Sequence, residues 1–152
     1  MPDIDKVIDL SACPLADEGF ITACRDQLDR DGVVTIPGFL REAARKALVA
    51  EAEAASPNAF FTSSTHNVYL TPPRPELGAA HVFNRQISSS KGCITTDQVP
   101  AASRLHAISG APPFRRFLAC VVGETALYEY ADPLSSINVH YAAAGQELGW
   151  HF

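Results

Sequence analysis

The sequence has little of the features that mark nucleic-acid-binding, membrane or secreted proteins. Only 12 of its 152 residues are Lys or Arg, the net charge is −5, and no basic run exceeds Arg115-Arg116. This balance argues against a nucleic-acid surface. No apolar run approaches the roughly 20 residues that cross a bilayer, and the acidic N-terminus lacks a signal-peptide pattern. We therefore expect a cytoplasmic protein that binds neither nucleic acid nor membranes.

The chain also lacks paired cysteine motifs. Its four cysteines, Cys13, Cys24, Cys93 and Cys120, form no CxxC pair, so a zinc knuckle or a thioredoxin-like motif is unsupported. A reducing cytosol keeps such residues as thiols. We expect them to act as small, partly buried hydrophobic residues. A catalytic Cys/His pair stays open, but no local signature favours it.

What the sequence does contain is an ordinary globular composition. Hydrophobic residues make up 47% and charged residues 19%, which is typical of a folded chain rather than a disordered one. There is no repeat and no low-complexity tract. The length fits one domain, so residues 1–152 are expected to fold as a single domain.

Helix patterns dominate the first part of the sequence. Ser11 or Asp17 can cap a first helix that runs to about Arg30. Pro near the first turn and Gly123 just after the last turn delimit the final helix. The further helices are expected at 41–55, 101–108 and 112–122.

Strand patterns gather toward the end of the chain. The β-branched run Val33–Ile36 predicts an early buried strand. The serine-rich run Ser88–Gly92 indicates a turn or mobile loop. The other expected strands are 66–70, 81–87, 127–130, 137–141 and 148–152. Helices followed by strands predict an α+β fold, with a final sheet that is incomplete.

The most informative segment is Asp132–Phe152, DPLSSINVHYAAAGQELGWHF. It carries two histidines, and a lone histidine on an apolar strand is more often a packed core residue than a ligand. For His151, the neighbouring residues favour a metal ligand over a packed core residue. Gly149 permits close backbone approach, while Trp150 and Phe152 would point to the opposite face of a strand. A strand that buries aromatic side chains behind an imidazole holds it rigidly, as a metal ligand requires.

Two phrases in the sequence resemble the iron(II)- and 2-oxoglutarate-dependent oxygenases. GQELGWHF resembles the segment that delivers the first ligand of the H-x-D motif, and DGVVTIPGFL (31–40) resembles the early strand and helix entry of the same superfamily. The resemblance extends over nearly all of the 152 residues, which would be only the N-terminal part of such an enzyme. The chain looks closest to the branch that hydroxylates or halogenates free amino acids.

The resemblance implies a double-stranded β-helix, or jelly roll, fronted by helices. It implies Fe(II) held by two histidines and a carboxylate, with 2-oxoglutarate and O₂ as co-substrates. His151 matches the first ligand. The carboxylate would follow Phe152 directly, and the second histidine and the basic residue for 2-oxoglutarate lie later in the family. We therefore expect an N-terminal portion, completed by a C-terminal fragment or working within a homo-oligomer.

The position after Phe152 separates two reactions in the resembling family. An aspartate there implies hydroxylation of a small substrate of the free amino-acid class, whereas a glycine leaves a site for chloride and implies a radical halogenase. We expect aspartate, because carboxylate-bearing members are the commoner case.

Four residues are candidates for substrate binding. Arg85 lies before the serine-rich run, where a guanidinium could fork onto a substrate carboxylate; a surface salt bridge is an equally good interpretation. Asn138 and His140 alternate on one strand face, and Glu147 lies next to the ligand segment. For other acidic residues, Asp97, Glu129 and Asp132, solvated surface charge is the better interpretation.

Two alternatives belong to other classes. In the first, the chain is a non-catalytic small domain in which His151 is structural. In the second, it is a different metal- or ligand-binding jelly roll, such as a cupin-like module.

Overall fold

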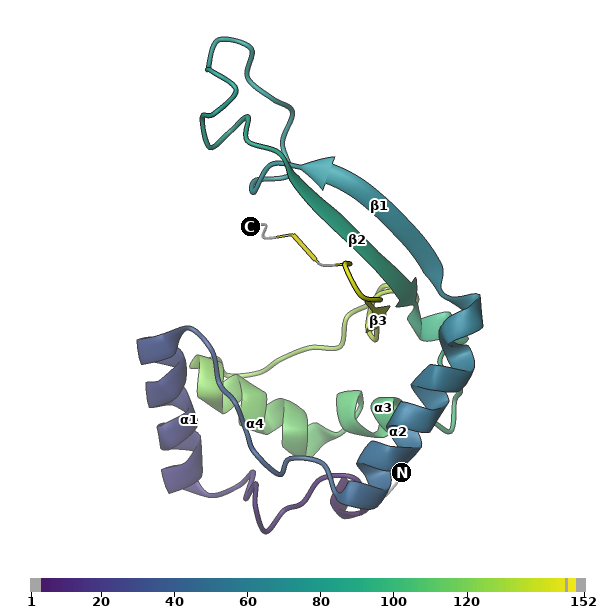
Figure 1. Cartoon of the computed structure of the whole chain (residues 1–152). Helices are drawn as coiled ribbons and strands as arrows, with labels where there is room; N and C mark the ends of the chain where they lie inside the picture. Colours follow the sequence, from purple (N-terminus) through teal and green to yellow (C-terminus); the bar gives the residue numbers. More distant parts are fainter. Residues whose placement is uncertain (1–3, 147, 150–152) are drawn as a thin grey trace. The chain divides into compact units, whose positions relative to one another are not determined.

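The computed structural model describes residues 4–146 and 148–149, and Figure 1 shows its helices and strands. The chain divides into two compact units. The helical unit comprises Met1–Ala54 and Thr95–Ile137, and the sheet unit comprises Ala55–Ile94 and Asn138–Phe152. Over the part of the chain that is described, four α-helices and a three-stranded antiparallel sheet confirm the α+β class.

Helix α1, Glu18–Asp31, begins and ends at local signals. The side chain of its N-cap, Asp17, accepts a hydrogen bond from the backbone N–H of Phe20 at 2.7 Å. This satisfies one of the N–H groups that have no partner within the helix. At the other end Gly32 has φ +70°, a left-handed conformation that glycine adopts without strain. The predicted first helix and its Asp17 cap are confirmed.

The other helices are α2 (Glu42–Ala55), α3 (Arg104–Ser109) and α4 (Pro112–Val122). Helix α3 starts later than the predicted 101–108, because Ser103 caps it by accepting from Leu105 N at 3.1 Å. The same hydroxyl donates to Glu51 Oε1 at 2.5 Å, which ties α3 to α2. None of the described helices is long and apolar enough to cross a membrane.

The helical unit is built around aromatic and aliphatic side chains from α1, α4 and the N-terminal segment. Phe117 is buried at its centre, and its ring lies 5.7 Å from that of Phe20. Phe39 contacts Phe114 at 5.3 Å between ring centroids. The buried residues of this cluster are Ile8, Cys13, Leu15, Cys24, Phe117 and Val121. Burial raises the pKa of the Cys13 and Cys24 thiols, so both act as the small hydrophobic residues that were expected.

The strand predicted at 33–36 is not formed. Val34 and Ile36 pack against the core of the helical unit, while Val33 is exposed. The run therefore has the alternation of a strand, but no neighbouring strand pairs with it along these residues. Only Leu40 makes an isolated bridge, with Ile8. β-Branched residues favour an extended chain, but a ladder also needs a partner.

The sheet unit contains β1 (Phe60–His66), β2 (Ile87–Ile94) and β3 (Val139–Tyr141), in the order β1-β2-β3. The first two strands pair along their full length, from Phe60 opposite Cys93 to His66 opposite Ile87. Strand β3 pairs only with the last residues of β2. Figure 1 shows β1 and β2 as a long ribbon joined by an extended connection. The described sheet is not closed, and it does not show a jelly roll.

Several expected strands are displaced. Apart from His66, which ends β1, and Ile87, which begins β2, the strands predicted at 66–70 and 81–87 fall on turns and irregular segments. Ser88–Gly92, expected to be a turn or loop, lies in the middle of β2. Serine and glycine are weak strand formers, so this strand depends on its pairing with β1 rather than on its own propensity. Residues 127–130 form no strand either. The prediction at 137–141 is largely confirmed by β3.

Candidate functional site

The structure places three of the five predicted site residues. Arg85, Asn138 and His140 all belong to the sheet unit. Glu147 and His151 lie outside the described residues. Leu148 and Gly149 are described, and neither lies in a strand. The strand predicted at 148–152 is therefore absent at its first two positions.

A buried asparagine organises the connection between β1 and β2. Asn67 is 1% exposed. Its Nδ2 donates to the carbonyl oxygens of Phe83 at 2.6 Å and Thr71 at 2.9 Å, while its Oδ1 accepts from the N–H groups of Tyr69 and Thr71. One side chain thus replaces the backbone partners that a regular element would supply. Residues 67–86 form an ordered loop rather than a loose one.

A second asparagine closes the outer half of this loop. Asn84 Oδ1 accepts from Arg74 N at 2.6 Å, and its Nδ2 donates to the carbonyl oxygens of Arg74 and Leu77, each at 2.7 Å. The Arg74 guanidinium lies 4.1 Å from the centroid of the Phe83 ring, a cation–π geometry. Leu70 has φ +54°, the only positive φ at a non-glycine residue in the described chain. The asparagine network holds this strained position.

The loop and strand β2 together enclose a cavity of about 320 Å³. Its walls are mainly apolar, and Arg85 is the charged residue among those that line it. The complete lining is Val68, Val82, Arg85, Ile87, Ser88, Leu148 and Gly149. An apolar pocket with one positioned cation is suited to a small molecule that carries an anionic group.

Gly149 packs directly on strand β2, which agrees with the close backbone approach expected at this glycine but not with the loop expected at 88–92. Its N–H donates to the Ser89 hydroxyl at 3.2 Å, and the residue is buried. A Cβ at this position would lie 3.1 Å from Ser88 O and 3.3 Å from Ile87 Cδ1. Such contacts are tighter than most Cβ contacts, so a larger residue here would require its neighbours to move by a few tenths of an ångström. The chain is therefore anchored at the cavity two positions before His151.

Four polar residues on β2, on β3 and directly before β3 form what we call the polar cluster: Lys91, Cys93, Asn138 and His140. Lys91 and Cys93 alternate along β2 and so share a face of the sheet. His140 lies directly opposite Cys93 in the register of β2 and β3. The Cys93 thiol donates to Asn138 Oδ1 at 3.5 Å. Asn138 directly precedes β3, so of the two residues expected on one strand only His140 lies in a strand.

The protonation of His140 is set by its surroundings. Desolvation, followed by the positive charge of Lys91, lowers the pKa of the His140 imidazole below its ordinary value of 6.5. The neutral form of the ring therefore predominates at neutral pH. A neutral imidazole is able to accept a hydrogen bond, take up a proton or bind a metal.

The described residues do not by themselves form a metal site. Among residues 4–146 and 148–149, no group of three or more His, Cys, Asp or Glu side chains is arranged to hold an ion. Cys93 and His140 are only a pair, whereas the two-histidine, one-carboxylate iron site uses three ligands. The fit of iron to this chain thus rests on His151, whose placement is not described.

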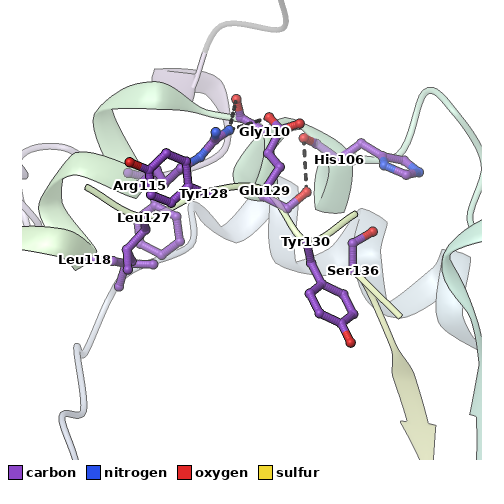
Figure 2. A pocket seen from close by; sticks show the side chains of 11 residues that line it. His106, Gly110, Arg115, Leu118, Leu127, Tyr128, Glu129, Tyr130 and Ser136 are labelled. Carbon is purple, nitrogen blue, oxygen red and sulfur yellow. Dashed lines mark hydrogen bonds and ion pairs between the residues drawn. The ribbon is translucent and has the colours of Figure 1, made fainter. Parts of the chain in front are cut away.

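The helical unit has a separate cavity of about 510 Å³, shown in Figure 2. Phe114, Leu118 and Leu127 supply apolar wall, and Arg115 pairs with Glu129 at 2.6 Å at its edge. The other lining residues are His106, Ser109, Gly110, Tyr128, Tyr130 and Ser136. Sequence analysis does not predict this cavity, because it assigns residues 127–130 to a strand, which the structure does not form.

The acidic residues that were expected to be surface groups have local structural roles. Asp97 accepts from the Thr95 hydroxyl at 2.6 Å. Asp132 accepts from Leu134 N and the Ser135 hydroxyl, and these bonds lower the pKa of its carboxyl. Glu129 forms the ion pair with Arg115.

Sequence analysis did not identify Asn67, Lys91 and Cys93 as residues of the candidate site. The alternation of Lys91 and Cys93 would have placed them on one face, had Ser88–Gly92 been interpreted as a strand. Asn67 gave no signal, because its most distant partner, the carbonyl of Phe83, follows it by 16 residues.

Comparison of the chain with models of known protein families finds no match, and comparisons with curated proteins and with solved structures find none either.

Proposed function

We propose that this chain is the N-terminal part of an iron(II)- and 2-oxoglutarate-dependent oxygenase, to which it contributes one metal ligand, His151, and part of the substrate pocket. The observation that carries the proposal is the anchoring of Gly149 on β2, at a cavity that contains Arg85. A ligand needs a rigid support, and this anchor lies two residues before the proposed ligand. The antiparallel sheet would be one part of a jelly roll that other strands complete.

Iron would activate O₂ together with 2-oxoglutarate once it is bound. The 152 residues offer one of the three ligands, so the proposal requires the others to come from further polypeptide, either a complementing fragment or another copy in an oligomer. A cytoplasmic location and hydroxylation rather than halogenation stay part of the proposal.

The residues of the sheet unit would bind and orient the substrate. Arg85 offers a planar set of donors to a carboxylate, and the apolar residues beside it fit a short aliphatic side chain. Asn138 and the neutral His140 would add hydrogen bonds on the sheet. These features support a free amino acid as the substrate class.

Anaerobic calorimetry with Fe(II) tests the metal ligand. The intact protein, meaning this chain together with the remaining ligands, should bind one ion, and His151→Ala should weaken binding at least about 100-fold, because a facial site loses a third of its protein ligands. His106→Ala is the matched control, since His106 belongs to the helical unit. Equal Fe(II) affinity of the wild type and His151→Ala would show that His151 is not a ligand of the iron.

A further inference from the structure

We infer that the cavity of the helical unit binds a small apolar molecule that carries a carboxylate, and that Arg115 recognises the charge. This inference does not depend on the proposed oxygenase function, because none of its residues belongs to the sheet unit. It rests on the size of the cavity, the chemistry of its walls and the contacts of one arginine.

The cavity has the size and the walls of a ligand pocket. Its volume of about 510 Å³ lies within the range of about 300–1,000 Å³ that small-molecule sites occupy. Helix α4 supplies Phe114 and Leu118, and the irregular segment after the helix supplies Leu127. Figure 2 shows Leu118 and Leu127 close to Arg115. The walls favour an aromatic or aliphatic body.

Arg115 is the cation of this cavity. Its side chain is 25% exposed, and its Nη2 donates to Glu129 Oε1 at 2.6 Å and to Gly110 O at 3.3 Å. A guanidinium carries five N–H donors in a planar fork that matches a carboxylate. Two acceptors on one nitrogen leave donors for a further anion.

Glu129 shows that the Arg115 guanidinium can bind a carboxylate. Its side chain is 70% exposed and comes from a segment without regular structure. Exposed ion pairs contribute little to stability, so an incoming carboxylate loses little by displacing Glu129. A ligand that also buries an apolar body in the cavity gains the free energy of removing apolar surface from water, which the Glu129 carboxylate does not.

Charge complementarity selects an anion over the alternatives. A cationic ligand would be attracted by Glu129 but would meet the less exposed guanidinium of Arg115 at the same place. A neutral ligand would have to separate this ion pair without replacing its charge, or leave it untouched. Of these three kinds of ligand, the one with a carboxylate both occupies the cavity and supplies an anion to Arg115 in place of Glu129.

Three probes with one skeleton separate these cases: 3-phenylpropanoate, 3-phenylpropanamide and 3-phenylpropan-1-amine. Each is titrated into the full 152-residue chain while methyl and aromatic NMR signals are recorded. The carboxylate should shift the methyl signals of Leu118 and Leu127 and bind at least about tenfold more tightly than the amide, as a charge-assisted hydrogen bond allows. The amine should bind most weakly.

Arg115→Met should weaken binding of the carboxylate by about tenfold or more, and Glu129→Gln should strengthen it by up to about fivefold, because the competing ion pair is gone. Arg116→Met is the control, since Arg116 neighbours Arg115 on α4 but does not line the cavity.

Equal binding of the three probes, tighter binding of the amine, shifts confined to other parts of the protein, or no binding at all would overturn the inference. So would an equal loss in Arg116→Met. If Arg115→Met fails to fold, the ranking of the three probes on the wild-type chain decides the matter.

Discussion

Lys91 and His140 lie on neighbouring strands, and the charge of the lysine helps to set the protonation of the histidine. Desolvation is the larger cause of the lowered pKa of His140, and the Lys91 ammonium is the second. Because the folded-state pKa lies below the ordinary value of 6.5, folding disfavours the imidazolium. The contribution of His140 to stability is therefore complete above about pH 6.5 and is lost as the pH falls below it.

Replacing Lys91 with methionine should raise the pKa of His140 toward its ordinary value, because the repelling charge is removed while the chain length is kept. An NMR titration of the His140 ring signals measures this directly. Lys46→Met is the control, since Lys46 lies on α2 and pairs with Glu42. An unchanged pKa of His140 in Lys91→Met would mean that the polar cluster is not arranged as described.

Asn67 is the residue on which the order of the loop depends. Asn67→Asp keeps the acceptors but loses the Nδ2 donor, which leaves the carbonyl of Phe83 without this partner. We expect a loss of about 2–4 kcal/mol in the free energy of unfolding, the usual range for breaking a buried polar network. Urea denaturation measures it. Asn58→Ala, at an exposed position of the 3₁₀ turn Ser56–Asn58, should stay within about 0.5 kcal/mol of the wild type; comparable losses in both variants would refute the role of Asn67.

At the scale of elements, helices could be predicted from the sequence, whereas most strands could not. The caps Asp17 and Gly123 are local signals, and each acts within one turn of its own helix. Strand β2 has no such signal, because ISSSKGCI becomes a strand through pairing with β1. Val33–Ile36 illustrates the converse, since strong propensity without a partner gave no ladder.

The candidate site likewise has one feature that could be predicted from local sequence and one that could not. The close approach of Gly149 could be predicted, because a glycine beside large aromatic residues is a local signal. The cavity around Arg85 could not, because it depends on a loop whose shape is fixed by hydrogen bonds between distant residues.

The anchor at Gly149 can be tested by adding a side chain. Gly149→Val should reduce the free energy of unfolding by about 1–3 kcal/mol, the usual cost of overpacking, because the new carbons would meet Ser88 O and Ile87 Cδ1. In the intact protein it should also weaken Fe(II) binding. Gly78→Val is the matched control, since nothing lies within 4 Å of a Cβ at that position. Equal stability and equal iron affinity in the two variants would show that the anchor is unimportant.

At the scale of the whole molecule, the two units carry different chemistry. The sheet unit holds Arg85, the polar cluster and the anchored segment before His151, whereas the helical unit holds the cavity at Arg115. The 152-residue chain alone should form no succinate from 2-oxoglutarate in the presence of iron(II), ascorbate and O₂, because one imidazole cannot replace three facial ligands. Succinate formation by the isolated chain would contradict the proposed division of ligands.

Succinate formation by the intact protein tests the role of His151 most directly. With iron(II), ascorbate, O₂ and 2-oxoglutarate, the intact protein should form succinate, and a set of free amino acids should stimulate the rate. His151→Ala should lower that rate at least about 100-fold, because the iron loses a ligand, while Arg116→Met should leave it unchanged. A fully iron-loaded intact protein that forms no succinate, or a His151→Ala variant that forms it at the wild-type rate, would contradict the assignment of His151 as an iron ligand of a 2-oxoglutarate oxygenase.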